Sequence, residues 1–263
     1  MTNPAGCDMS KIQVMFGLLV DMMNDTMRLI QKVEFNKGSR VHRAVMALYA
    51  SIIEHTDSAM LLRTHGRAAG IDTILRTNLE AFVDLVNLCN DPAYYNQMLA
   101  LYHKDWLALT QGGLDGNPFL DFFKEDPGSA QRVEYHKAAL AELQKLGPTL
   151  NVFDRFQLAG LENEYRSVYK DLCGHSHNNI NSLSDQHFVG NTENSLEVVI
   201  FAEMGKEALL SSLDQFIAIL GTAGYIVHHY FKSPVAKEAA ALKTRRNELQ
   251  SFFDEETGSE VTA

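Results

Sequence analysis

Side chains capable of acid–base chemistry are crowded into one stretch of the sequence, residues 162–181, which reads ENEYRSVYKDLCGHSHNNIN. Two histidines, His175 and His177, follow a tyrosine-rich segment that contains Tyr169. Imidazole changes its charge near neutral pH, so either ring is a candidate general acid or base. The alternative is a polar helix end in which each ring bonds to nearby carbonyl groups.

A second candidate group, Arg76 and Glu80, lies much earlier in the chain. These residues are four positions apart on a helix predicted over 68–89, so they share a face and can form an ion pair. They flank the apolar stripe of that helix, which either buries the pair or leaves it as an ordinary surface ion pair. We expect this helix to face the end of the Tyr169 segment. The predicted site therefore comprises Arg76, Glu80, Tyr169, His175 and His177.

The segments LRTNLEAFVDLVNL and EYRSVYKDLCGHSHNN together resemble a family of all-helical bacterial proteins known only as a domain of unknown function. The resemblance extends over residues 40–183. Members of that family carry an Arg-x-x-x-Glu helix, followed later by a Tyr and a Leu on one helix turn and then a His. The matching residues here are Arg76, Glu80, Tyr169, Leu172 and either His175 or His177.

That family is similar in turn to the broader HEPN-type helical bundles, several of which are RNA-cutting toxins or phage-defence proteins. The resemblance implies a bacterial cytoplasmic defence or stress-response protein that acts on RNA as a metal-independent ribonuclease. One histidine would act as base, the other as acid, and Arg76 or Arg166 would stabilise the phosphorane. The HEPN signature, Arg and His separated by four to six residues, is not met by Arg166 and His175 or by Arg132 and His136.

Two other functions are consistent with the same sequence. Facing helices could hold iron, manganese or zinc through Glu54, Glu80, His175 and His177, although the usual Glu-x-x-His pair is missing. A non-catalytic module that forms a homodimer or binds a protein partner is the other alternative. Its candidate surfaces are the methionine-rich helix over 11–33 and the Tyr/Trp face of 92–110, although both stripes are more typical of a core.

Composition and motifs narrow the function classes. The net charge of −10 disfavours duplex DNA as a partner, although RNA remains a candidate. Three widely separated cysteines and an N-terminus without a basic-then-apolar pattern favour a reduced, cytoplasmic protein.

The most apolar late segment, Phe216–Val227, is too short to span a bilayer, so we interpret it as a core helix and expect no membrane partner. No dinucleotide, phosphate-loop, zincin or hydrolase motif is present, and no cofactor is predicted.

Apolar residues at three- and four-residue steps predict an all-α fold, a single antiparallel bundle of about seven or eight helices over residues 1–253. Residues 254–263 are predicted to form a disordered acidic tail. The expected helices cover 11–33 with Ser10 as cap, 39–64, 68–89, 92–110, 130–146 with Ser129 as cap, 162–173, 195–231 and 236–253.

The segments between these helices carry further expectations. Gly112-Gly113 ends one helix before a packed loop, and Gly174 ends the central helix so that both histidines emerge beyond it. Residues 149–160 are predicted to be irregular, and 186–201 to form a small hairpin or a loop. Gly221 or Gly224 marks a kink in the long late helix, and Arg245-Arg246 lie on an exposed face of the last one.

Overall fold

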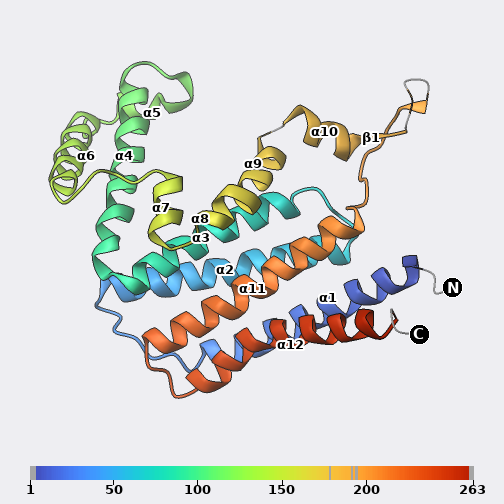
Figure 1. The fold of residues 1–263 in the computed structure, drawn as a ribbon. Helices are drawn as coiled ribbons and strands as arrows, with labels where there is room; N and C mark the ends of the chain where they lie inside the picture. Colours follow the sequence, from blue (N-terminus) through green and yellow to red (C-terminus); the bar gives the residue numbers. More distant parts are fainter. Residues whose placement is uncertain (1–3, 178, 191, 193–194, 261–263) are drawn as a thin grey trace.

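The computed structural model describes residues 4–177, 179–190, 192 and 195–260. It confirms the predicted all-α, multi-helix architecture (Figure 1). The long helices are α1 (Pro4–Ile30), α2 (Arg40–Thr64), α3 (Ile71–Asn90), α4 (Tyr95–Leu114), α6 (Ser129–Gln144), α11 (Lys206–Tyr230) and α12 (Ala236–Glu260). Shorter ones are η1 (Pro92–Tyr94), η2 (Pro118–Leu120), α5 (Phe122–Glu125), α7 (Val152–Leu158), α8 (Glu162–Glu164), η3 (Tyr165–Tyr169), α9 (Lys170–Ser176) and α10 (Ile180–His187).

The hydrophobic core lies where five long helices meet. Helix α2 packs on α3, α11 packs against α1, α2 and α3, and α12 covers α11 (Figure 1). Tyr49, Leu75 and Ile217 are almost fully buried there. Each such side chain contributes about 1.5–3 kcal/mol relative to an exposed position, which is enough to fix how the helices pair.

Helix α11 lies at the centre of the bundle and is shorter than the helix predicted over 195–231, because it begins only at Lys206. With 25 residues, the helix is long enough and apolar enough, by length and composition alone, to cross a bilayer. The estimate from the sequence, that the apolar segment Phe216–Val227 is too short for that, is therefore corrected. It buries apolar side chains against its neighbouring helices, including Phe216 and Leu220, so the prediction of a core helix holds. It runs as one helix through Gly221, beside which Met22 and the backbone of Leu242 pack closely.

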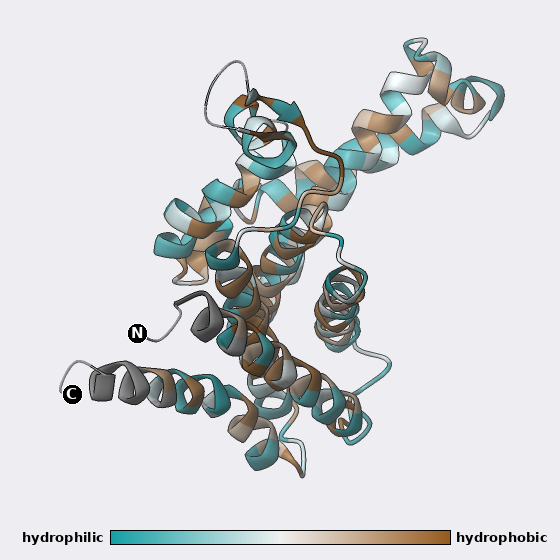
Figure 2. Ribbon diagram, turned by 90° about the vertical axis from the view of Figure 1, so that its right-hand side faces the viewer, coloured by the Kyte–Doolittle hydropathy of each residue, from teal (hydrophilic) through white to brown (hydrophobic). Residues whose placement is uncertain are grey.

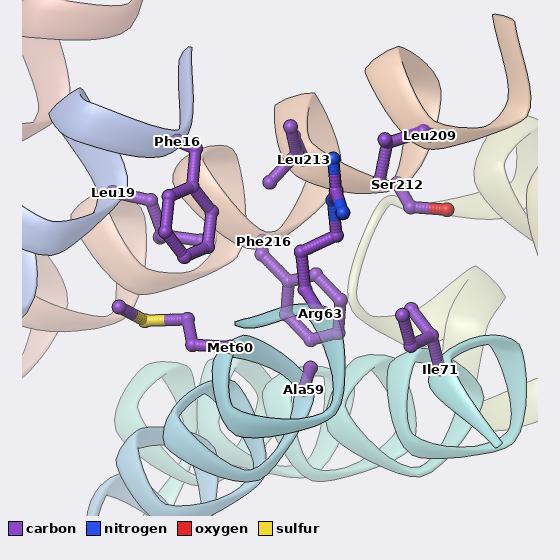
Figure 3. Close-up of a pocket in the computed structure, with 10 residues that line it drawn as sticks. All are labelled: Phe16, Leu19, Ala59, Met60, Arg63, Ile71, Leu209, Ser212, Leu213 and Phe216. Atoms are coloured by element: carbon purple, nitrogen blue, oxygen red, sulfur yellow. The ribbon is translucent and has the colours of Figure 1, made fainter. Parts of the chain in front are cut away.

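Close packing at the junction of α1, α2, α3 and α11 positions the N-termini of α3 and α11 side by side. Side chains from the four helices point towards one another in Figure 3, among them Phe16, Met60 and Phe216. The void that they enclose is about 10 Å³, room for at most one water molecule. Ser212 of α11 lies at this junction and also lines the much larger cavity described below.

Helices α4, α5 and α6 form a hairpin that projects from the bundle (Figures 1 and 2). Helix α4 continues through Gly112-Gly113 to Leu114, four residues beyond the predicted end at residue 110. The absence of a side chain at Gly113 is what lets Phe123 pack against α4, since a Cβ there would lie 2.8 Å from Phe123 Cβ. Residues 112–129 are thus partly helical rather than the predicted packed loop, because Phe123 is buried whereas Phe119 and Phe122 are exposed.

Several predicted helix ends differ from the structure. Ser39 caps α2 as expected, but Ser10 lies inside α1, and α6 begins at Ser129 with Gly128 before it. Residues 149–160 are not irregular, because Asn151 and Asp154 form a capping box that starts α7.

The segment after the central helix contains one element that the sequence analysis missed. Helix α10 precedes a two-stranded antiparallel hairpin, β1 (Phe188–Val189) and β2 (Glu197–Val198), which matches the small predicted hairpin. Its turn, residues 190–195, lies partly outside the described residues.

The last helix differs from its predicted surface role. Arg245 bonds to Asp25 of α1 at 2.7 Å and Arg246 to Asp214 of α11 at 2.6 Å, so these arginines join α12 to the bundle instead of facing solvent freely. Helix α12 extends to Glu260 and includes most of the segment predicted as a tail, whose last three residues lie outside the described part of the chain.

Candidate functional site

A row of charged side chains runs along one face of α3. Asp72, Arg76, Glu80 and Asp84 are spaced four residues apart, which places them on the same side of the helix. Helices α7 and α9 pack against α3. Each of these four residues has a polar partner on the segment that contains α7, η3 and α9. We call this line of polar contacts between α3 and that segment the seam.

Arg76, Glu80 and Tyr169 form the centre of this seam, which confirms that the two predicted segments meet. The Tyr169 hydroxyl donates to Glu80 Oε1 at 2.8 Å and accepts from Arg76 Nη2 at 3.2 Å. Arg76 Nη2 also lies 3.2 Å from Glu80 Oε1, with both side chains about three-quarters buried. The pair is therefore part of a tertiary contact and not an ordinary surface ion pair.

Tyr169 is held in place by an irregular turn and by aromatic neighbours. Residues Tyr165–Tyr169 form a single π-helical turn, a feature that often marks functional positions because it redirects side chains. The Tyr169 ring contacts Phe156 at 4.9 Å and stacks on Tyr165 at 5.3 Å. Burial raises the pKa of Tyr169, an effect that its bond from Arg76 opposes, so the phenol stays protonated at neutral pH.

A buried ion pair closes the seam beyond Glu80. Arg155 of α7 donates from Nη1 to both oxygens of Asp84 at 3.0 Å, and Tyr94 donates to Asp84 at 2.6 Å. Arg155 Nη2 lies 3.9 Å from Glu80 Oε2, which links this pair to the central cluster. Sequence reasoning missed both Arg155 and Asp84. The position of Asp84 four residues after Glu80 was the only available signal.

His175 occupies the opposite end of the seam. Its Nδ1 lies 3.6 Å from Asp72 Oδ2 and 3.0 Å from the Gln186 amide nitrogen. Burial raises the pKa of Asp72, the facing His175 lowers it, and Asp171 raises it further. Gly174 does not end the helix, so His175 lies within α9 rather than beyond it. Which of Gln186 and His175 donates in this contact depends on the tautomer of the ring.

His175 and Asp72 line a large cavity. It measures about 660 Å³ and is enclosed by α3, α9, α10, the segment before α11 and the first turns of α11. This volume is within the range of small-molecule sites, and it combines apolar walls with a few polar groups. Its position was not predicted, because it depends on how α10 and α11 close over α3 and α9.

The other sequence candidates lie apart from this site. His177 is exposed just after α9 and does not line the cavity. Arg166 is exposed and pairs with Glu162 at 2.7 Å, which removes it as the nearby cation. Glu54 is exposed on α2. Among the described residues, no three His, Cys, Asp or Glu side chains are arranged to hold a metal ion, so the predicted ligand set is not assembled.

Two chemically different units therefore share one seam. In the Arg76–Glu80–Tyr169 cluster each charge has a counter-charge, which is typical of a structural network. At the cavity, by contrast, the imidazole of His175 lies beside the Asp72 carboxylate and bonds to the Gln186 amide, so a group that can exchange a proton with a ligand faces the open space. The catalytic roles assigned from the sequence remain predictions.

Comparisons with known proteins place the chain in a family but not in a functional class. No curated protein and no solved structure matches it. A family of unknown function, DUF5677, matches residues 42–196, which is more than half of the chain and includes Asp72, Arg76, Glu80, Tyr169 and His175. The chain therefore belongs to the DUF5677 family of unknown function.

Proposed function

We propose that this protein binds a small molecule in the cavity between α3, α9, α10 and α11. The observation that carries the proposal is the cavity itself: about 660 Å³, with the oriented His175 on its wall. A concave site of mixed polarity that holds a titratable pair is the usual form of a ligand or substrate site. The His175–Asp72 pair would exchange a proton with the bound molecule.

A cavity-filling variant tests this proposal. Ala208 lines the cavity and is exposed in the first turn of α11, so Ala208→Trp fills space without entering the core. We expect the uncharged dye Nile red to bind the wild type saturably, with one dye per chain, and Ala208→Trp to abolish this binding. The control is Ala241→Trp, on the exposed side of α12, which should bind dye as the wild type does. Equal binding by Ala208→Trp would exclude the cavity as the site.

A HEPN-like ribonuclease of bacterial cytoplasmic defence is the second candidate. It is supported by the meeting of Arg76, Tyr169 and Glu80 on the seam that also holds His175. The carboxylates on the cavity wall weigh against it, because they repel phosphate groups. The test is RNA cleavage in EDTA: wild type and His177→Ala should cut, and His175→Ala and Arg76→Ala should not. An inactive wild type would remove this candidate.

A homodimer or protein-partner role is a third candidate, supported by the projecting hairpin. Tyr102, Trp106 and Leu109 of α4 and Tyr135 of α6 expose large parts of their side chains. Aromatic residues are enriched in the centres of interfaces. If this surface joins two copies, sedimentation should show a dimer that Trp106→Lys converts to a monomer, and a monomeric wild type would contradict it.

A further inference from the structure

The charged side chains around the cavity are of one sign. Asp72, Asp171 and Asp185 line it, and among its described lining residues there is no lysine or arginine. A fourth carboxylate, Glu203, also lines a smaller neighbouring cavity of about 230 Å³ that contains Arg63 and Arg67. Arg63 and Arg67 line the same small cavity as Glu203, whereas the three aspartates line only the larger of the two.

Asp72 is the carboxylate with the greatest need of a cation. Its side chain is only 20% exposed, and no arginine or lysine pairs with it among the described residues. Its nearest ionisable partner, His175, lies 3.6 Å away and is charged only when protonated. Asp171 is a like charge facing the same group. A buried carboxylate with a like charge beside it is costly, and a bound cation would relieve that cost.

The rest of the lining combines apolar side chains with uncharged polar ones such as Ser167, Ser211 and Gln215. Its apolar part includes Leu75 of α3, Val168 of η3, Leu172 of α9, Met204 of the segment before α11 and Ala208 of the first turn of α11. These side chains favour burial of a hydrocarbon body, at roughly 25 cal/mol for each Å² removed from water. The cavity thus has both negative and hydrophobic lining.

From this distribution we propose that the ligand is an amphipathic cation, a small molecule with an amine or guanidinium group on an apolar body. The cationic group would lie against Asp72 and Asp171, and the body against Leu75, Val168 and Leu172. The inference rests on the proposed function, because it names the class of molecule that the same cavity binds. It also accounts for the lack of a fixed cation beside Asp72.

Three probes of nearly equal size and different charge test the ligand class: 4-phenylbutylamine, 4-phenyl-1-butanol and 4-phenylbutyrate. Their binding to the full-length protein is measured directly by calorimetry and separately by displacement of Nile red. The amine should bind at least about tenfold more tightly than the alcohol, a difference of about 1.4 kcal/mol, and the carboxylate most weakly. The preference for the amine should fall as salt is added.

Single neutralising variants assign the effect to named residues. Asp72→Asn and Asp171→Asn should each weaken binding of the amine by about tenfold and leave binding of the alcohol unchanged. The matched control is Asp57→Asn, an exposed position on α2 that does not line the cavity and should bind all three probes as the wild type does.

The outcomes separate the two proposals. Equal affinity for the three probes, no binding of the amine, or a preference that survives both substitutions would overturn the ligand class. Saturable Nile red binding that Ala208→Trp blocks would still support the cavity as a binding site. A preference for the amine that persists in Ala208→Trp would place the cation site elsewhere and overturn the ligand class, and both proposals fall if Nile red binding persists there as well.

Discussion

The hydroxyl group of Tyr169 joins η3 to both Arg76 and Glu80 of α3. Tyr169→Phe keeps the buried ring but removes the bonds to Glu80 and Arg76. We expect the free energy of unfolding to fall by about 1–3 kcal/mol, because two partly buried charged groups lose a partner. Urea denaturation measures the change. Tyr165→Phe, at the stacked neighbour, is the control and should cost less than about 0.5 kcal/mol.

Arg155 is the residue whose removal should destabilise the seam most. Its side chain is 11% exposed and that of Asp84 17%, so Arg155→Met leaves a buried carboxylate whose remaining partner is Tyr94. Breaking a buried pair in this way costs about 3–5 kcal/mol. Chemical denaturation of the double variant Arg155→Met/Asp84→Asn should show a smaller loss than the sum of the single ones. Additive losses would mean that the two residues do not act as a pair.

His228 predicts a dependence of stability on pH. It is fully buried on α11, neither ring nitrogen has a protein partner among the described residues, and burial lowers its pKa. Below the unfolded value of about 6.5 the unfolded chain binds a proton that the folded ring does not. The neutral His228 ring therefore makes its full contribution to the free energy of unfolding above the unfolded-state pKa of about 6.5, and this contribution is lost as the pH falls below that value.

Denaturation at pH 8 and pH 5.5 measures this effect in His228→Leu. The variant should be at least as stable as the wild type at pH 5.5 and should lose less stability on acidification. Some dependence should remain, because burial and the neighbouring His103 also lower the pKa of His136. An unchanged loss of stability in the variant would show that His228 does not contribute.

Individual site residues could be predicted from the sequence where their spacing along one helix or segment already brings them together. Arg76 and Glu80 were recognised because a four-residue spacing on one helix has a direct physical meaning. Tyr169 was recognised within a crowded polar segment. Asp72 and Arg155 were not, because their significance comes from partners that only the tertiary fold brings near them.

At the scale of helices, periodicity located most elements but misjudged where they end. Gly174 reads as a helix end, yet α9 continues through it, because the segment packs along α3 and tertiary contact outweighs the intrinsic cost of glycine. Helix α7 was missed although its capping box, Asn151 and Asp154, is visible in the sequence. The position of a helix end depends on small differences in local free energy, whereas burial of the apolar face of a helix involves much larger ones.

The two adjacent glycines of α4 provide a matched pair of substitutions. A Cβ at Gly113 would lie 2.8 Å from the Leu120 carbonyl oxygen and from Phe123, so Gly113→Ala should destabilise the hairpin by about 1–3 kcal/mol. At Gly112 the nearest atom, Leu120 Cδ1, lies 3.8 Å away. Gly112→Ala should therefore be stabilising, by about 0.5–1 kcal/mol, through helix propensity.

Amide hydrogen exchange across residues 95–144 is the measurement for these two variants. Faster exchange in Gly113→Ala than in Gly112→Ala is the expected order. The reverse order would show that the packing of Phe123 on α4 is not what holds the hairpin together.

At the scale of the whole molecule, the residues matched by the family model and the helices that form the hydrophobic core overlap only in part. Residues 42–196 contain the seam. Outside that segment lie α11, which packs against α2 and α3, and α1 and α12, which pack against α11. The fold class was predictable because long amphipathic helices permit few ways to bury their stripes. The cavity was not, since α11 closes it from a distant part of the sequence.

The projecting hairpin should be removable without unfolding the bundle. The structure describes all of residues 99–149, and none of them belongs to the hydrophobic core cluster. Met98 and Leu150, on either side of this segment, pack against that cluster. The two ends of the hairpin are close together, since the Gln97 amide bonds to the Pro148 carbonyl and to the Leu150 amide, both at 3.1 Å. About four Gly/Ser residues, each spanning up to roughly 3.5 Å, can therefore join Met98 to Pro148.

This shortened protein should unfold cooperatively and bind Nile red with unchanged affinity, because the cavity and the bundle core lie outside the hairpin. Thermal unfolding followed by circular dichroism, together with dye titration, measures both properties. If the hairpin is the surface that joins two copies, the shortened protein should also be monomeric under conditions where the wild type is dimeric. A chain that fails to fold would instead show that the bundle depends on contacts from α4 beyond its first turn, and that the hairpin is part of one cooperative unit.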